Sequence, residues 1–228
     1  MERKKEPMPK KRSSPVRPPS GKSDGDGEKI LRRFHSEPLR YKICVSGASE
    51  TGLCSDDCFE KSVLLGREIA RRGLVLLTGA TTGVPYWVAK AVKEEGGVVI
   101  GFSPAASKQA HVRTYHLPMD YHDVIMYTGF HYSGRNLLLM RASDAIITVC
   151  GRIGTLNEFT IGFEDKKPVG VLEGTGGMAD RLREIVEQAH RGPGKVVYSR
   201  DPKELLDKVI ELIKADEKEA GISNGTVA

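Results

Sequence analysis

The chain has 228 residues, a formal net charge of +5, 39% hydrophobic residues and 6% aromatic residues. This composition supports a packed core, and we expect one globular α/β domain. No segment approaches the roughly 18 uninterrupted apolar residues that span a bilayer, and the first residues lack the apolar core of a secretory signal. The sequence therefore argues against a membrane or secreted protein, and we expect a soluble, cytoplasmic one.

The positive charge is concentrated at the start of the chain, whereas the remainder is close to neutral. The first 22 residues contain Arg3, Lys4, Lys5, Lys10, Lys11, Arg12, Arg17 and Lys22. This stretch is rich in Pro, Ser, Gly and Lys and has almost no apolar residues before Ile30, so it cannot bury enough surface to order itself. We predict a disordered basic tail over 1–38, one domain over 39–216 and a flexible tail over 217–228.

From Tyr41 onward, short apolar runs alternate with longer periodic segments, which is the pattern of repeated βα units and a parallel sheet. Most of the runs have four to six residues and are rich in Val and Ile, as expected for strands covered on both faces. The predicted strands span 41–46, 74–78, 98–103, 124–127, 145–149, 168–172 and 195–198. The predicted fold is a doubly wound, Rossmann-like parallel sheet with helices on both faces, in a single domain.

Helix-start and helix-stop signals separate these strands. A helix is predicted from Asp57 to a stop at Gly73, another from Pro85 to Gly96, and a last one opened by Asp201 and Pro202. The stretch from Pro104 to about His122 lacks such a pattern, so we expect a long loop that serves as a lid or a dimer contact. The histidines at 111, 116, 122 and 131 have irregular spacing and are interpreted as loop residues.

Loops rich in Gly, Ser and Thr follow four of the predicted strands. In an open parallel sheet, ligands bind beyond the carboxyl ends of the strands, so these loops should converge on one cleft. The segment 151–158 adds a glycine turn leading into a helix, where backbone N–H groups hold phosphate. The candidate phosphate-binding residues are Ser46, Gly47, Gly79, Thr81, Thr82, Gly83, Gly151, Arg152, Gly154 and Thr155. The chain contains neither a G-K-[ST] loop nor a G-x-G-x-x-G fingerprint, which argues against ATP-driven phosphoryl transfer and a classical NAD role.

Two charged residues near the predicted cleft are candidates for chemistry. Glu158 falls one turn into the helix after the glycine turn, where a carboxylate beside a phosphate is a poor choice for affinity alone. Arg135 opens a helix at the same edge, and its guanidinium offers a fork of donors to a phosphate or substrate. A surface or helix-pairing role for Arg135 is the alternative.

The four cysteines fit neither a zinc ribbon nor a CxxC pair. Cys44 and Cys150 lie on or beside hydrophobic strands, so we interpret them as small core side chains in a reducing compartment. Cys54 and Cys58 lie four residues apart near a helix start and could share a face, but two ligands make a weak metal site. No metal is predicted.

Arg135 with Asn136, the run Ser143-Asp144-Ala145 and the segment Cys150 to Glu158 together resemble the LONELY GUY (LOG) family. These nucleoside 5′-monophosphate phosphoribohydrolases were long mislabelled as lysine decarboxylases. The resemblance implies a homodimer without an organic cofactor that cleaves the N-glycosidic bond of a nucleotide to a free base and ribose 5-phosphate. It implies catalytic roles for Arg135 and Glu158, and phosphate binding by the glycine turn.

Four positions depart from the LOG pattern. Cys150 replaces a proline, Arg152 a glycine, Asn136 a lysine and Asn157 a glutamate. These departures bring the chain closer to a divergent nucleotide-binding branch that also resembles molybdenum cofactor carrier proteins. A non-catalytic binding or carrier protein for a nucleotide or a phosphorylated pterin is therefore the alternative. Nucleic-acid binding through the basic tail is the least favoured hypothesis.

Overall fold

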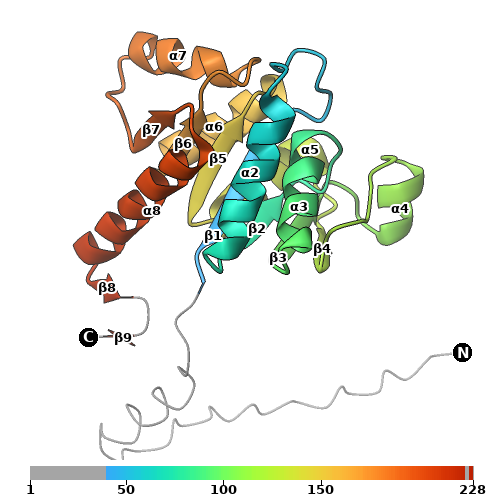
Figure 1. Cartoon of the computed structure of the whole chain (residues 1–228). Coiled ribbons are helices and arrows are strands. Elements are labelled where there is room, and N and C mark those ends of the chain that lie inside the picture. The colour runs from blue at the N-terminus through green and yellow to red at the C-terminus, as the bar shows by residue number, and fades with distance from the viewer. Residues whose placement is uncertain (1–39, 224–225, 228) are drawn as a thin grey trace, which may run out of the picture. The chain divides into compact units, whose positions relative to one another are not determined.

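The computed structural model describes residues 40–223 and 226–227, and the predicted basic tail over 1–38 lies outside them. Seven parallel strands form one sheet, and Figure 1 shows them between layers of helices. The strands are β1 (Lys42–Gly47), β2 (Val75–Thr78), β3 (Val98–Ser103), β4 (Val124–Tyr127), β5 (Ala145–Val149), β6 (Val169–Leu172) and β7 (Val196–Ser199). Their bounds agree with the predicted strands to within one residue, which confirms the predicted parallel α/β fold.

The strand order is β4-β3-β2-β1-β5-β6-β7. The chain runs outward from β1 to β4, returns to the centre, pairs β5 with β1, and then runs outward on the other side. The order therefore reverses between β1 and β5. In a doubly wound sheet, the crevice at the carboxyl ends of these two strands is the expected place for a ligand.

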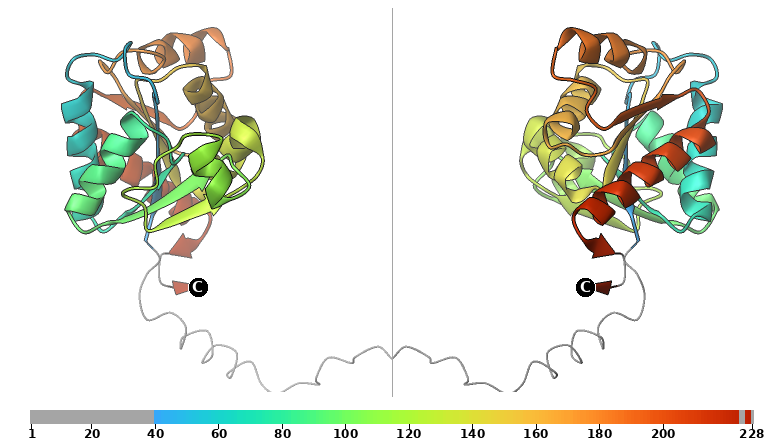
Figure 2. Two further views of the ribbon diagram at one scale, coloured as in Figure 1. Left: turned by 90° about the vertical axis from the view of Figure 1, so that its right-hand side faces the viewer. Right: turned by 90° about the vertical axis from the view of Figure 1, so that its left-hand side faces the viewer.

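Helices cover both faces of the sheet (Figure 2). One face carries α2 (Cys58–Arg71), α3 (Val84–Glu94) and α8 (Pro202–Glu219), and the other carries α5 (His131–Ala142), α6 (Ile153–Glu164), the 3₁₀ turn η1 (Ala179–Arg181) and α7 (Leu182–Gln188). Alternate residues of β1 supply the two cores, since Ile43 packs with the first group of helices and Cys44 with the second. This alternation follows from the two-residue period of a strand.

The last helix begins at the predicted position and ends later than the predicted domain boundary. The Asp201 carboxylate accepts a hydrogen bond from the backbone N–H of Glu204 at 2.7 Å, which caps α8. The helix runs to Glu219, past the expected boundary at Asp216, and two short strands follow, β8 (Ile222–Ser223) and β9 (Thr226–Val227).

The prediction of a structureless loop between Pro104 and His122 is wrong. The segment contains α4 (Lys108–Arg113), capped by the Ser107 side chain. His111 is fully buried, with Nδ1 at 2.8 Å from the Ser103 hydroxyl and Nε2 at 2.9 Å from the carbonyl oxygen of Pro118. The buried imidazole, the Ser107 cap and further backbone hydrogen bonds order the segment, and such contacts leave no periodic pattern in the sequence.

Among the described residues, every helix is too short or too polar to cross a membrane.

Candidate functional site

A cleft of about 900 Å³ opens at the carboxyl ends of the strands on either side of the switch point. Its volume lies in the range of small-molecule sites. The loops after β1 and β2, the first turns of α5 and the start of α6 form its walls. The predicted site residues on the walls are Ser46, Gly47, Gly79, Thr81, Arg135, Arg152, Gly154, Thr155 and Glu158. The other three, Thr82, Gly83 and Gly151, do not line the cleft.

The turn between β5 and α6 presents backbone donors to the cleft. Cys150 and Gly151 both have positive φ, 51° and 94°, and α6 begins two residues later at Ile153. The N–H groups of a helix's first turn have no acceptor within the helix, and Arg152 supplies no side-chain cap. A Cβ placed on Gly154 would meet no atom within 4 Å, so the helix start is open on that side. The arrangement is suited to an anion.

The three predicted residues outside the cleft shape the loops instead. A Cβ on Gly151 would collide with the Thr155 side chain, and one on Gly83, whose φ is 71°, would collide with the carbonyl oxygen of Ala48. The Thr82 hydroxyl donates to the carbonyl oxygen of Ser49 at 3.0 Å. These contacts explain why the sequence is rich in Gly and Thr here.

Arg135 is almost completely buried, and its side chain connects loops of the protein. The Nη1 atom donates to the carbonyl oxygens of Gly79 and Phe102, the latter at 2.9 Å. Any side chain at residue 79 would collide with the guanidinium, which explains the glycine there. Arg135 therefore links the turn after β2 to the end of β3, and its remaining edge lines the cleft.

Two departures from the LOG pattern meet in space. Arg135 Nε donates to Asn136 Oδ1 at 3.0 Å, and Asn136 Nδ2 donates to Asn157 Oδ1 at 2.9 Å. The lysine and the glutamate of the LOG pattern are thus replaced together by two amides that link α5 to α6. This amide pair links α5 to α6 without charge, at two positions where the LOG pattern has charged residues.

Glu158 lies at the bottom of the cleft and is 7% exposed. The Ser46 hydroxyl donates a hydrogen bond to its carboxylate. Burial raises the pKa of Glu158 above the ordinary range, although the Arg135 charge and the Ser46 hydrogen bond act in the opposite direction. A carboxyl that keeps its proton at higher pH can act as an acid, and it repels a phosphate less than an ionised one.

Arg152 lies at the mouth of the cleft, at the position where the LOG pattern has a glycine. Its guanidinium forms an ion pair with Glu50 at 2.9 Å, and its side chain is half-exposed. A surface pair of this kind contributes little to stability. The ion pair joins the loop after β1 to the turn before α6, and a Cβ on Gly154 would still meet no atom within 4 Å.

Several cleft residues were not singled out from the sequence. Tyr132 and Ser133 lie on the α5 wall, and Ile153, 75% exposed, stands at the mouth. Tyr132 lies three positions before Arg135, whose guanidinium carbon is 5.8 Å from the centre of its ring. An exposed aromatic residue next to a candidate arginine is the signal that could have identified it.

The interpretation of Cys150 as a free core thiol is wrong. Its Sγ forms a disulfide with Cys54, across a sequence separation of 96. Cys44 and Cys58 are free and buried. The pairing depends on the approach of two loops from distant parts of the chain, which residue spacing does not reveal.

Comparison with known proteins assigns the domain to a family, because the SLOG cluster4 family pattern matches residues 40–206. The chain belongs to the SLOG cluster4 family. This places it in the LOG/SLOG superfamily with a Rossmann-like fold. An uncharacterized protein from Archaeoglobus fulgidus is 30% identical over 132 residues, which cover 58% of this chain and 82% of that protein.

Two solved structures resemble this SLOG protein over nearly their full length. The molybdenum cofactor binding protein from Rippkaea orientalis is 28% identical, with a TM-score of 0.61, and the match covers 78% of this chain and 98% of that one. The molybdenum cofactor carrier protein from Chlamydomonas reinhardtii is 25% identical, with a TM-score of 0.62, and the match covers 77% and 99%.

Proposed function

We propose that this SLOG protein binds a small phosphorylated ligand, either a nucleotide or a phosphorylated pterin of the molybdenum-cofactor type, as a binding or carrier protein. The observation that carries the proposal is the uncapped start of α6, open at Gly154 and located at the switch point of the sheet. The ligand's phosphate would accept hydrogen bonds from the N–H groups of that first turn. The remainder of the 900 Å³ cleft would hold the ring system, beside Tyr132.

The polar residues of the α5 wall support binding over catalysis. Arg135 donates to two backbone carbonyls and to Asn136, whose own partner on α6, Asn157, is neutral. The relatives with molybdenum cofactor binding or carrier functions in their names share the fold over nearly their whole length. Their ligand class is consistent with a cleft of this size and polarity.

A phosphoribohydrolase is the second candidate, and Glu158 is the observation that favours it. The buried carboxyl lines the cleft and has a raised pKa. In that reaction it would stabilise the positive charge that develops on the ribose or activate a water molecule, and Arg135 would orient the sugar. The products would be a free base and ribose 5-phosphate.

We also propose a homodimer acting in the cytoplasm, with no nucleic-acid partner. Leu137 and Leu138 are exposed on α5, and Val124 and Met126 are about half-exposed on the edge strand β4. Burial of such side chains against a second copy would remove apolar surface from water. Analytical ultracentrifugation tests the proposal, and a monomer at all concentrations would contradict it.

The binding proposal is tested by calorimetric titration of the full chain with nucleoside 5′-monophosphates and with the matching nucleosides, and by mass spectrometry of ligand retained through purification. Gly154→Asp is the decisive variant, because it places a carboxylate where the phosphate would lie, with no steric conflict inside the protein. We expect binding to fall at least about tenfold, since a change of 1.4 kcal/mol gives that factor.

The matched control is Gly154→Asn, which has nearly the same shape and no charge. It should bind phosphorylated ligands better than Gly154→Asp does. Equal affinity of the two variants, or equal affinity of wild type for nucleosides and their monophosphates, contradicts a phosphate site at α6.

Chromatographic detection of free base separates the two candidate functions. Release of base by wild type and its loss in Glu158→Gln establish the hydrolase. Binding of an intact nucleotide with no release of base supports the binding protein.

A further inference from the structure

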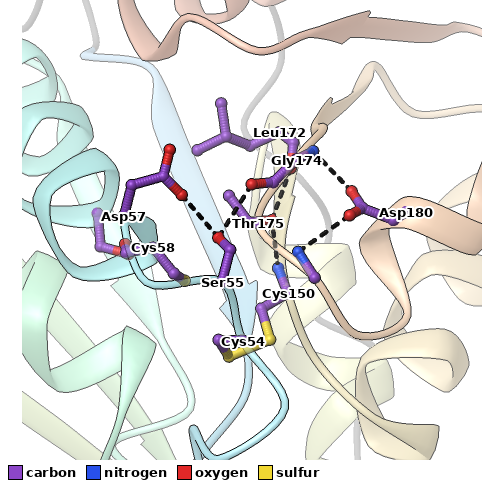
Figure 3. The surroundings of a disulfide bond; sticks show 11 residues. Cys54, Ser55, Asp57, Cys58, Cys150, Leu172, Gly174, Thr175 and Asp180 are labelled. Carbon is purple, nitrogen blue, oxygen red and sulfur yellow. Dashed lines mark hydrogen bonds between the residues drawn. A yellow bond between two sulfur atoms is a disulfide. The ribbon is translucent and has the colours of Figure 1, made fainter.

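Three cysteine sulfur atoms lie close together near the turn between β5 and α6. The Sγ atoms of Cys54, Cys58 and Cys150 are all within 4.8 Å of one another. Cys54 comes from the loop between β1 and α2, Cys58 is the first residue of α2, and Cys150 directly follows β5 (Figure 3). Cys54 and Cys150 form the disulfide, and Cys58 is free. None of the three lines the cleft.

Hydrogen bonds hold the backbone of this cluster independently of the disulfide (Figure 3). The backbone N–H of Cys150 donates to the Thr175 hydroxyl at 2.9 Å, and that hydroxyl donates to the carbonyl oxygen of Leu172 at 2.7 Å. The backbone N–H of Ser55 donates to the carbonyl oxygen of Thr175 at 3.0 Å. Opening the disulfide therefore leaves the backbone beside Cys54 and Cys150 tied to one common residue.

The loop after β6 is fixed as well. The Asp180 carboxylate accepts hydrogen bonds from the N–H groups of Gly174 and Gly176, at 2.7 and 3.1 Å. Gly176 forms a β-bridge with Cys54, and a Cβ on Gly177 would come within 3.0 Å of the Cys150 sulfur. The cluster is consequently enclosed by ordered backbone on this side.

In the reduced state this cluster has the composition of a thiolate metal site. A Zn²⁺ ion with sulfur ligands at about 2.3 Å places its thiolates about 3.8 Å apart, which fits inside a 4.8 Å cluster. Cys58 and Cys150 are buried in an apolar core, where several neighbouring thiolates need a cation to offset their charge. Cys54 is only partly buried, so a fourth ligand can reach the ion from solvent.

We propose that the reduced protein binds one Zn²⁺ ion, or another thiophilic cation, through Cys54, Cys58 and Cys150. Two electrons and two protons from a dithiol reductant first open the Cys54–Cys150 bond, which yields two thiols and the oxidised, disulfide form of the reductant. Binding of the ion then forms three metal–sulfur bonds and releases the three S–H protons to solvent.

The metal-bound and disulfide states exclude each other, because the same two sulfurs are needed in both. Both the metal-bound state and the disulfide state connect Cys150, at the start of the turn between β5 and α6, to the loop before α2. Metal binding by these cysteines does not depend on a phosphorylated ligand in the cleft, because none of the three lines it.

The test uses the full chain, reduced and then freed of reductant under anaerobic conditions. Zinc content is measured by mass spectrometry after addition of Zn²⁺ alone, and Co²⁺ alone provides a second readout through sulfur-to-cobalt charge-transfer absorption. We expect one ion per chain in reduced wild type and none in the oxidised protein. Reduced wild type without bound zinc, or equal zinc binding by the oxidised form, overturns the proposal.

Cys58→Ser is the central variant, because it removes one ligand and leaves the disulfide pair intact. Its zinc affinity should fall by more than the roughly 100-fold that loss of an outer-shell contact costs. Cys44→Ser, a buried free cysteine outside the cluster, is the matched control and should bind zinc like wild type. If Cys58→Ser does not fold, Cys58→Ala replaces it. Wild-type zinc affinity in a folded Cys58 variant overturns the proposal.

Discussion

The two walls of the cleft use their polar groups differently. On the α5 wall, Arg135 and Asn136 satisfy the hydrogen bonds of other protein groups, whereas at the start of α6 the backbone donors have no side-chain cap. Arg135, which the sequence suggests for chemistry, and the amides Asn136 and Asn157 are cross-links between elements. We propose that backbone N–H groups at the start of α6 hold the ligand, where the amino-acid sequence shows only a glycine turn.

The largest loss of stability is expected from Arg135→Met. It leaves the carbonyl oxygens of Gly79 and Phe102 without their charged donor, at a cost of about 1.5–3 kcal/mol for each bond. We expect the free energy of unfolding, measured with urea, to fall by about 3–5 kcal/mol.

Arg141→Met provides the control for this variant. Arg141 lies on the same helix but is exposed, and it pairs with Asp165 at the surface, so its loss should cost less than about 1 kcal/mol. If Arg135→Met retains full stability and only loses ligand affinity, Arg135 binds the ligand directly. The proposed difference between the α5 wall and the start of α6 would then be wrong.

A smaller effect on stability is expected from the paired amides of Asn136 and Asn157. Asn136→Lys and Asn157→Glu each introduce an unpaired charge at a link between α5 and α6, but the double variant restores a pair of opposite charges. We expect the double variant to be more stable than the sum of the single effects predicts, by about 0.5–3 kcal/mol in a double-mutant cycle.

The control cycle combines Asn157→Glu with Lys90→Met, an exposed residue of α3 on the opposite face of the sheet. Its effects should add within about 0.5 kcal/mol. Strict additivity in both cycles means that the two asparagines are not energetically coupled.

The third and smallest effect is a pH dependence of folding stability that arises from Glu158. Its folded pKa is raised by burial, so between the unfolded value of about 4.3 and the folded value the native state binds more protons than the unfolded state. Its contribution to stability is complete below the unfolded pKa and is lost as pH rises through the folded pKa. Each unit by which the pKa is raised contributes about 1.4 kcal/mol.

Glu158→Gln has no titrating group at this position. Urea unfolding of wild type and variant from pH 4 to pH 8 should therefore show wild type losing stability relative to the variant as pH rises. Parallel stability curves would mean that the Glu158 pKa is not shifted by folding.

The sequence was sufficient for the sheet and for the location of the cleft. Strands such as β3 and β5 are mostly apolar because both faces are covered, and these apolar runs indicate where the strands lie. The cleft followed from the rule that loops at the carboxyl ends of parallel strands meet, since nine of the twelve candidate residues line it.

What the sequence did not reveal depends on contacts between distant loops. The Nη1 atom of Arg135 donates to backbone carbonyl oxygens, which every residue possesses, so no residue type identifies these partners. The disulfide joins cysteines 96 residues apart. Within 104–122, the buried imidazole of His111 contacts the Ser103 hydroxyl and the carbonyl oxygen of Pro118. Periodicity reports burial along one element, and these contacts lie between elements.

The position of β1 beside β5 also determines when the cleft can form during folding. Asp144, directly before β5, pairs with Lys42, the first residue of β1, across a separation of 102 residues. Closing so long a loop costs entropy before any contact compensates for it, and non-local pairings of this kind slow folding. The cleft needs residues after both β1 and β5, so it should be among the last parts of the domain to reach its native geometry.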